Sequence, residues 1–293
     1  MGIEYFLQQL VNGICLGGMY ALMSVGYSLV YSIMNFSNFA HGGVIMVGAY
    51  AILTTLNITG NPVLAIVVSI VVCTAAGIAI ERLAYRPLRG ASPLAVLITA
   101  IGVSYFLQSI AQLIFGAKSR PVTLPSFGNL SVGSAQISVA TLITLVAGAV
   151  IMVALTLFVK FTRTGRAMQA VSEDRGAAQL MGVNVNRIIM ITFAIGSALA
   201  AFASLFYLLQ IPSTNPTLGS MPGIKAFTAA VIGGIGSIPG AMLGGVLLGL
   251  IEKICLSIPV IAPYTTAVEF SLLILILLIK PIGLLGKKRR VKV

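Results

Sequence analysis

Long apolar stretches separated by short polar loops follow one another along the whole chain. Each stretch, if helical, is long enough to cross the roughly 30 Å of hydrocarbon in a lipid bilayer. The sequence does not show the alternating pattern that is typical of membrane barrel strands. We therefore predict an all-α, polytopic helical membrane protein that forms a single transmembrane domain over residues 1–293. The candidate spans are residues 5–31, 39–56, 62–80, 94–116, 138–159, 188–210, 223–254 and 265–280.

Composition excludes a water-soluble domain. Hydrophobic residues make up 58% of the chain and charged residues only 8%, and the mean hydropathy is +1.05, which leaves too little polar surface to face water. The first span has no cation before it and no small-residue cleavage site after it, so we expect a retained helix and not a signal peptide. The cysteines (Cys15, Cys73 and Cys255) lack metal-ligand spacing, and we expect them to be packing residues.

The net charge of +12 is distributed in a way that argues against nucleic-acid binding. The cations gather in loops that flank apolar spans, at residues 82–89 and 160–187 and in the basic tail 281–293. The positive-inside rule predicts that these regions are cytoplasmic. The uncharged loops at 57–61 and 211–222 should then be external, together with the N-terminus. Lys118 and Arg120 are exceptions to this assignment.

The number of spans conflicts with this topology. The spans above, crossed one after another from an external start, would leave the C-terminus outside, whereas the basic tail predicts that it is inside. One span must therefore be broken, re-entrant or double, which gives about eight to ten membrane segments. Two segments have the glycine, proline and polar content of a break: "NFSNFAHGGVIMVGAY" (residues 35–50) and "GGIGSIPGAMLGG" (residues 233–245).

Irregular backbone at membrane depth survives where it is buried in protein or lines a cavity, so both segments are candidates for a translocation path. Asn35, Asn38 and His41 recur at spacings of three and could share a helical face. The other candidate path residues are Gly42, Gly236 and Gly240. His41 is the only histidine, which excludes a histidine-based metal cluster within the chain. We expect it to be hydrogen-bonded in support of the broken segment, the alternative being a proton carrier.

Glycines recur every four residues in several places, so that each set shares one helical face. The sets are Gly13 with Gly17, Gly245 with Gly249, and Gly236 with Gly240 and Gly244. Such faces let two helices approach closely. They could serve packing within the chain, a subunit interface or the lining of a path.

A polar island interrupts the apolar pattern at "RTGRAMQAVSEDRGAAQLMGVNVNR" (residues 163–187). Within it, Ser172 can cap a helix whose first turn carries Glu173 and Asp174, and Gly182 can end that helix in a left-handed conformation. On this helix one nearly flat side would hold small residues: Ala170, Asp174, Ala177, Ala178 and Met181. The island could be a connector lying on the headgroups or a docking site for a soluble partner.

Several stretches resemble the permease subunits of bacterial ABC importers. "GAAQLMG" (residues 176–182) is similar to their Glu-Ala-Ala-x-x-x-Gly loop, with Gly176 where the glutamate often stands. "NFSNFAHGG" resembles the Asn-Phe-Ala-His-Gly segment of branched-chain amino acid importers, and residues 223–252 resemble their glycine-rich segment. "LLIKPIGLLG" (residues 277–286) resembles their closing Arg-Pro-x-Gly-Leu-x-Gly, with Lys280 replacing arginine.

The resemblance implies an ABC importer permease fold in the cytoplasmic (inner) membrane of a bacterium or archaeon. It implies a second homologous permease subunit, two cytoplasmic ATPase subunits and an external solute-binding protein that delivers leucine, isoleucine or valine. The island would contain the ATPase-coupling helix, with the coupling residues Arg166, Glu173, Asp174, Ala177, Ala178, Met181 and Gly182. ATP and magnesium would be bound by the partners, since this chain has no Gly-x-x-x-x-Gly-Lys-Ser/Thr loop. We expect no cofactor, metal or catalytic residue on this chain.

Two alternatives stay open at this point. The same architecture could carry urea, short amides or a sugar, or the chain could be a self-sufficient channel or secondary transporter with its own coupling-ion site of buried carboxylates. Lys225 and Glu269 are charged residues inside predicted spans, where a charge is costly and suggests function by default. Snorkelling to the membrane surface or a mutual ion pair would also explain them, and Glu252 could pair with a cation nearby.

Overall fold

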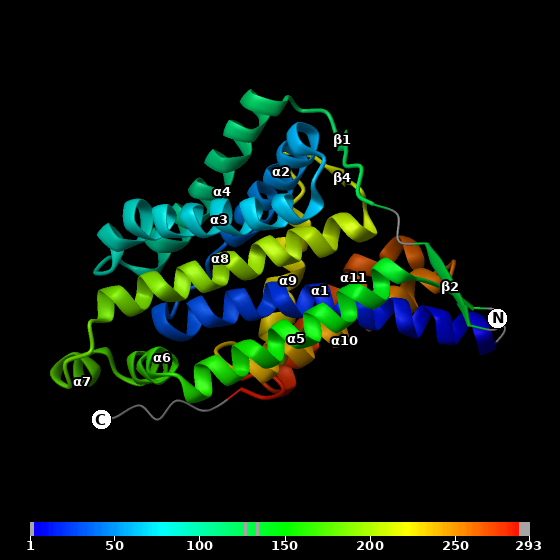
Figure 1. Cartoon of the computed structure of the whole chain (residues 1–293). Helices are drawn as coiled ribbons and strands as arrows, with labels where there is room; N and C mark the ends of the chain where they lie inside the picture. Colours follow the sequence, from blue (N-terminus) through cyan, green and yellow to red (C-terminus); the bar gives the residue numbers. More distant parts are fainter. Residues whose placement is uncertain (1–2, 126–127, 133–134, 287–293) are drawn as a thin grey trace.

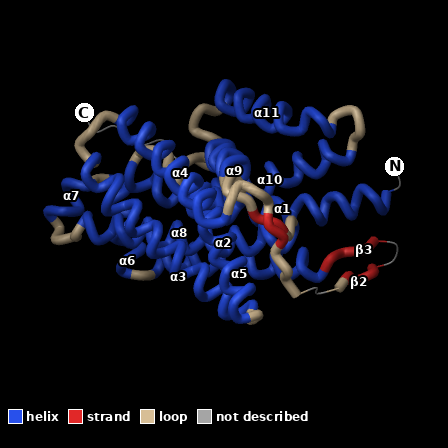
Figure 2. The backbone as a smooth tube through the Cα atoms, turned by 90° about the horizontal axis from the view of Figure 1, so that it is seen from above, coloured by secondary structure: helices blue, strands red, loops and turns tan. Residues whose placement is uncertain are grey.

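The computed structural model describes residues 3–125, 128–132 and 135–286. Helices dominate the described chain, and Figures 1 and 2 show them as one elongated bundle. Two short antiparallel pairs, β1 with β4 and β2 with β3, lie in the loops. The strands are β1 (Arg120–Pro121), β2 (Asn129–Val132), β3 (Ala135–Ser138) and β4 (Ser213–Thr214). The helices are α1 (Ile3–Met34), α2 (His41–Thr59), α3 (Pro62–Ile80), η1 (Glu81–Tyr85), η2 (Arg86–Leu88), α4 (Pro93–Phe115), α5 (Val139–Phe161), α6 (Arg163–Glu173), α7 (Arg175–Leu180), α8 (Val185–Gln210), α9 (Ser220–Gly233), α10 (Ile238–Ser257), η3 (Ala262–Tyr264) and α11 (Thr265–Ile279).

Helix α1 is the central element of the bundle, with α5, α8, α9 and α10 packed around it. Its contact with α10 is very close because glycines meet there. A Cβ atom added to Gly17 would lie 2.6 Å from the Cα of Val246, and Gly245 and Gly249 press on α1 in the same way. The predicted glycine faces Gly13/Gly17 and Gly245/Gly249 therefore pack against each other within one chain.

The predicted span 223–254 is double. Helix α9 ends at Gly233, the chain turns at residues 234–237, and α10 returns antiparallel to α9, with Gly233 against Gly240 and Ala229 against Gly244. Gly234 and Gly236 have φ angles of 112° and 90°, which residues with a side chain rarely adopt. Among the described residues, eight helices are long and apolar enough to cross a membrane. Helix α9, with 14 residues, is shorter than these.

The segment 35–50 is interrupted only at its start. Residues 35–40 are not helical, Asn35 has a left-handed φ of 59°, and α2 then runs without a break from His41 to Thr59. The prediction that Asn35, Asn38 and His41 share a helical face is therefore wrong. The glycines that suggested a break inside this segment serve close contacts, since Gly42 touches the backbone of Gly219.

The first part of the predicted basic tail is packed on the bundle. The backbone amides of Leu284 and Leu285 donate to the carbonyls of Ile232 (2.9 Å) and Gly233 (2.8 Å) at the end of α9. Gly283, with a φ of 81°, lies against Gly234. Residues 287–293, which carry the basic cluster of the tail, lie outside the described residues.

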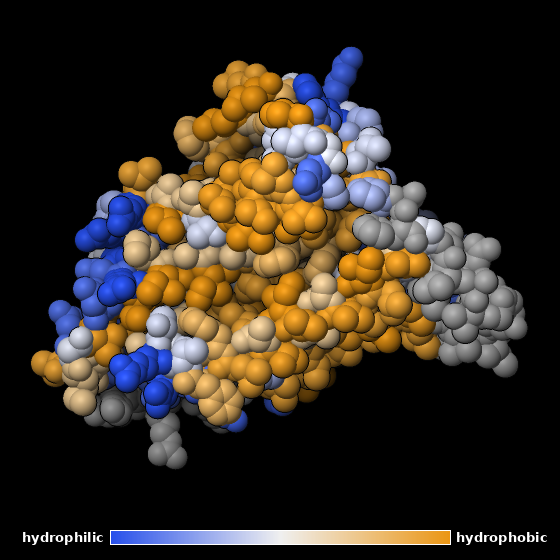
Figure 3. Space-filling model, in the orientation of Figure 1, coloured by the Kyte–Doolittle hydropathy of each residue, from blue (hydrophilic) through white to orange (hydrophobic). Residues whose placement is uncertain are grey.

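The surface divides into a wide apolar belt and polar ends. Figure 3 shows the belt over the middle of the bundle and hydrophilic residues gathered at the end that carries α6 and α7. We call that end, with Arg82, Arg89 and Arg175, the basic end. The loop between α2 and α3 lies at the opposite end. Helices α3, α4, α5 and α11 bury little of their own surface and expose large apolar side chains, as a multi-pass membrane protein requires.

Lys118 and Arg120, the exceptions to the charge pattern, belong to the opposite end. The Arg120 guanidinium donates to the carbonyl oxygen of Phe115 (2.5 Å) and lies 5.8 Å from the centre of that ring. It therefore neutralises the negative dipole end of α4 locally. Its place reflects helix capping and does not require this loop to lie at the basic end.

Candidate functional site

The polar island consists of two helices instead of one. The Thr162 hydroxyl accepts a hydrogen bond from the Gly165 amide (3.0 Å) at the start of α6, and the Asp174 carboxylate accepts one from the Ala177 amide (3.0 Å) at the start of α7. Asp174 is extended, with φ −153°, and separates the helices. The prediction that Ser172 caps the helix is wrong, because its hydroxyl donates to the Gln169 carbonyl within α6 (2.7 Å).

The predicted end of the island helix is confirmed. Gly182 has a φ of 81°, and its amide donates to the Gln179 carbonyl (3.0 Å). The next amide, from Val183, donates to the Ala178 carbonyl (3.0 Å). This is the left-handed closure that glycine favours at a helix C-terminus.

One small residue of the island, Ala178, faces the chain itself, and the tip of α7 is apolar. Ala178 is only 4% exposed, so it packs against the bundle and cannot lie on a flat outer surface. Leu180 and Met181, in contrast, are 91% and 84% exposed. Of the other predicted coupling residues, Arg166, Glu173, Asp174, Ala177 and Gly182 are exposed. Bulky apolar side chains that project into solvent from a tightly capped turn are typical of a docking surface.

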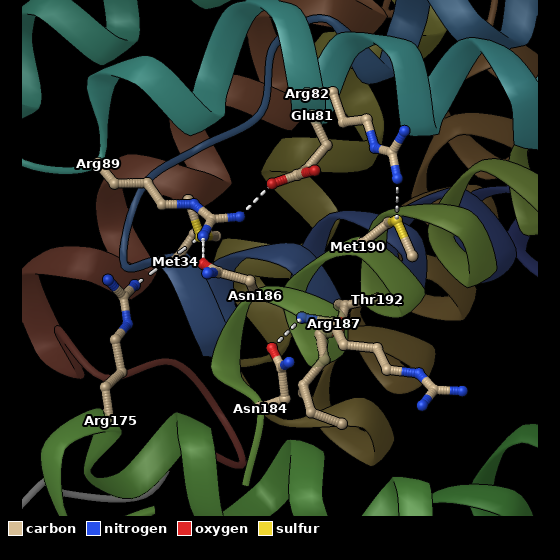
Figure 4. A network of polar contacts seen from close by, with 11 residues as sticks. Met34, Glu81, Arg82, Arg89, Arg175, Asn184, Asn186, Arg187, Met190 and Thr192 are labelled. Atoms are coloured by element: carbon tan, nitrogen blue, oxygen red, sulfur yellow. Dashed lines mark hydrogen bonds and ion pairs between the residues drawn. The ribbon is translucent and has the colours of Figure 1, made fainter. Parts of the chain in front are cut away.

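A polar network holds this segment to the rest of the basic end (Figure 4). The Arg175 side chain on α7 donates from Nε to the carbonyl of Ile33 (3.2 Å) in the last turn of α1. Arg89 forms an ion pair with Glu81 and donates to the side chain of Asn186 on α8. Arg175 thereby connects α7 to α1, and Arg89 connects η1 to α8.

A cleft of about 140 Å³ opens beside this network. Met34, Asn35 and Phe36 line it from the end of α1, and Leu88, Arg89, Ala91, Pro93, Val96 and Arg175 complete its wall. Of the predicted path residues, Asn35 alone is in this wall. The sequence placed Arg89 and Arg175 in two separate cationic loops and gave no sign that both line one cleft.

The remaining predicted path residues are held inside the chain or in its turns. Asn38 is 5% exposed and accepts a hydrogen bond from the Tyr85 hydroxyl (2.6 Å). His41 is 2% exposed and packs edge-on against Tyr27, with ring centres 4.8 Å apart. Among the described residues, His41 Nε2 has no hydrogen-bond partner, which differs from the hydrogen-bonded role that we expected. Its ring fills the space above Gly26 instead.

Gly236 and Gly240, the two predicted path residues in the turn and first part of α10, both make structural contacts. The Gly236 amide donates to the Ser28 hydroxyl of α1 (2.9 Å), which ties the turn to the central helix. Gly240 lies in the close contact with Gly233 that joins α9 to α10. A side chain at Gly240 would meet backbone atoms of the neighbouring helix.

The charged residues inside the spans form one buried cluster, which confirms a mutual ion pair. The Lys225 ammonium lies 2.9 Å from Glu252 and 3.2 Å from Glu269, and Glu252 also accepts a hydrogen bond from the Tyr20 hydroxyl (2.8 Å). Lys225 is 9% exposed and Glu269 only 1%, so neither side chain snorkels. We call Lys225, Glu252 and Glu269 the buried triad. Together with Tyr20, the triad joins α1, α9, α10 and α11.

Within the described part of the chain, no three His, Cys, Asp or Glu side chains come together as metal ligands. The cysteines are buried and unpaired, as expected for packing residues.

The family model for the branched-chain amino acid transport system permease component matches residues 9–278. The high-affinity branched-chain amino acid transport permease protein BraD of Pseudomonas aeruginosa is 45% identical, covering 99% of both chains. The corresponding protein LivH of Escherichia coli K12 is also 45% identical, over 99% of this chain and 98% of its own. A solved structure described as an inward-facing metal-chelate type ABC transporter aligns with a TM-score of 0.51, at 17% identity, over 94% of this chain and 87% of that one. That likeness shows a shared fold.

Proposed function

The chain belongs to the family of branched-chain amino acid transport permease components, and from that membership we propose that it is the membrane-spanning subunit of an ATP-driven importer of leucine, isoleucine and valine. Its role is transport and not catalysis. The chain binds no cofactor in this proposal, and partner subunits bind ATP and magnesium.

The importer contains four kinds of component. A second, similar permease completes the membrane path, two cytoplasmic ATPases supply the energy, and an external solute-binding protein delivers the amino acid. The large apolar area that α3, α4, α5 and α11 leave exposed supports a membrane setting with room for a second permease.

One observation carries the proposal: the exposed tip of α7. Leu180 and Met181 project from the basic end, where positive charge indicates the cytoplasm. Such side chains gain about 1.5 to 3 kcal/mol each when they are fully buried, so a soluble partner that covers them would bind there. We infer that the ATPases cover this tip.

The contacts of α7 suggest how a movement of the ATPases reaches the membrane. Arg175 donates a hydrogen bond to the carbonyl of Ile33, which attaches α7 to the last turn of α1. Helix α7 is also followed in the chain by α8. A displacement of the tip would therefore move the end of the central helix, next to the break at residues 35–40. The path would open alternately to the two sides in response.

The topology follows from the same charge pattern. With the basic end in the cytoplasm, and with α9 counted as a ninth pass beside the eight long helices of the described chain, the N-terminus lies outside and the C-terminus inside. The loop between α2 and α3 and the pair β1–β4 then face the solute-binding protein.

The test is retention of the ATPases by the tagged permease after purification in mild detergent. Leu180→Asp puts a charge on the tip and should remove most of the ATPase from the purified complex, while the permease itself stays folded. Ile58→Asp is the matched control, because Ile58 is also an exposed apolar residue (82%) but lies at the opposite end. We expect this variant to retain the ATPase.

Uptake of radiolabelled leucine by proteoliposomes that contain the full complex measures the function itself. The Leu180→Asp complex should lose ATP-dependent uptake together with its ATPase. Uptake of leucine without ATP, or full ATPase retention by the variant, would refute the proposal.

A further inference from the structure

The cleft at the basic end combines positive charge with room for a ligand. Arg89 and Arg175 both belong to its wall, and none of the described residues that line it is acidic. Figure 4 shows the two side chains coming from different elements toward Met34, whose sulfur lies 3.9 Å from Arg175 Nη2. The cleft volume of about 140 Å³ is roughly ten times what one buried water needs. A phosphate group therefore fits, together with bound water.

Arg89 has a hydrogen-bond donor that its own chain does not use. Its Nη1 donates to the side chain of Asn186 and its Nη2 to Glu81. Its Nε is buried and has no hydrogen-bond partner among the described residues. Buried polar atoms nearly always have a partner, so the guanidinium at the cleft wall is ready to donate to an acceptor from outside the chain.

The cleft lies at the level of the lipid headgroups. Its wall includes residues from the connection 88–92 between α3 and α4, two helices that bury little of their own surface. On either side of this connection, Leu83 is 80% exposed and Leu94 is 64% exposed. Hydrocarbon chains must therefore reach both flanks of the connection, and the polar headgroups that border the hydrocarbon lie at its depth.

We propose that the cleft binds the phosphate group of an anionic phospholipid from the cytoplasmic leaflet. Guanidinium groups form strong, charge-assisted hydrogen bonds with phosphate. Basic pockets between membrane helices on the cytoplasmic side suit such headgroups. Arg89 and Arg175 bind the phosphate oxygens, and the acyl chains stay in the bilayer along α3 and α4. The site does not depend on which solute the importer carries.

A lipid phosphate in this place would connect two parts of the basic end. Arg89 is held to η1 by Glu81 and to α8 by Asn186, whereas Arg175 belongs to α7, which carries the exposed tip. Inorganic phosphate has the same chemistry and is the other source of such a ligand. It gains nothing from the apolar surface on the two flanks of the connection, and this favours the lipid.

The experiment is native mass spectrometry of the purified full-length permease with added phosphatidylglycerol, and with phosphatidylcholine for comparison. Ala91→Glu places a carboxylate in the cleft wall at an exposed position, where it competes with the phosphate for the arginines. Asn35→Asp adds the same charge from the end of α1 with almost no change in shape. Ala91→Gln is the matched neutral control. Arg86→Gln removes an exposed cation of the same end that does not line the cleft.

The unaltered chain, Ala91→Gln and Arg86→Gln should bind phosphatidylglycerol with equal affinity, and more tightly than phosphatidylcholine. Ala91→Glu and Asn35→Asp should each bind it about tenfold more weakly, because a hydrogen bond to a charged group is worth at least that factor. Millimolar inorganic phosphate should leave the bound lipid in place. Thermal midpoints should be the same for all variants, since the altered residues are exposed.

Three results overturn the proposal. Affinities of Ala91→Glu and Asn35→Asp equal to that of Ala91→Gln would show that the cleft is not the site. An equal loss in Arg86→Gln would mean that the whole basic end attracts the lipid. Displacement of the lipid by inorganic phosphate would assign the cleft to a soluble anion. The proposed function would fail separately, in the uptake of leucine, because none of these measurements involves transport.

Discussion

Replacement of Lys225 by methionine tests whether the buried triad holds the membrane helices together. Lys225 is the cation shared by Glu252 (2.9 Å) and Glu269 (3.2 Å). Methionine preserves most of the length of the side chain, so the main effect is loss of the charge. Two carboxylates then remain in a space that no longer holds a cation.

The structure allows the size of the effect to be worked out. Removal of one partner of a buried ion pair costs about 3 to 5 kcal/mol, because the other charge stays buried without compensation. Glu269 is 1% exposed and, within the described part of the chain, Lys225 is its only ion-pair partner. At roughly 2 to 4 °C per kcal/mol, the Lys225→Met midpoint should fall by about 10 °C.

A second substitution makes the prediction specific to the pair. Glu269→Gln alone leaves Lys225 paired with Glu252 and should cost less than Lys225→Met. The double variant carries one buried carboxylate fewer than Lys225→Met. Its loss of stability should therefore be smaller than the sum of the losses in the two single variants. Lys118→Met, the loss of an exposed lysine, is the control and should leave the midpoint unchanged.

The assay is thermal unfolding of the purified protein with a fluorogenic thiol reagent. The three cysteines are buried, so the reagent reports exposure of the core as the bundle opens. A Lys225→Met midpoint equal to that of the control, or single losses that simply add in the double variant, would show that the triad contributes little.

Two further predictions follow from close contacts and exposure. Gly17→Ala should lower the same midpoint by the equivalent of about 1 to 3 kcal/mol, since its Cβ would lie 2.6 Å from the Cα of Val246; Gly18→Ala, with nothing within 4 Å, should not, and equal midpoints would contradict the packing argument. A membrane-impermeant maleimide applied to intact cells should label Ile58→Cys and leave Gln179→Cys unlabelled, because the buried native cysteines give little background. The reverse pattern would contradict the proposed orientation.

The sequence predicted the broad architecture because the length of the apolar stretches and the position of the charges reflect the surroundings of each segment, which are lipid or water. Apolar spans match the bilayer, and charges are placed where water is. The parity of the spans even required a broken or double segment. It could not say which one, because α9 and α10 together read as one long apolar run. Their separation depends on positive φ angles at Gly234 and Gly236, which are a property of the turn and not of hydrophobicity.

The pattern of helix-capping residues predicted the candidate site less well. Ser172, Thr162 and Asp174 can all cap a helix, and the sequence alone offered no means to choose among them. The choice depends on where the backbone becomes extended, which tertiary packing decides. The same limit explains Ala178: a small residue suits an outer docking face and an inner packing face equally well. Only the fold shows that Leu180 and Met181 form the exposed tip.

The length of α9 explains why so many separate contacts converge on it. With 14 residues it rises about 21 Å, which is less than the hydrocarbon thickness of a bilayer. Hydrophobic matching to the lipid therefore cannot fix its depth, and protein contacts must do so. Gly233 and Gly240 set its distance from α10, Leu284 and Leu285 bind its last carbonyls, and Lys225 ties its first half to α10 and α11. Loosening any one of the contacts should then affect transport before it affects insertion into the membrane.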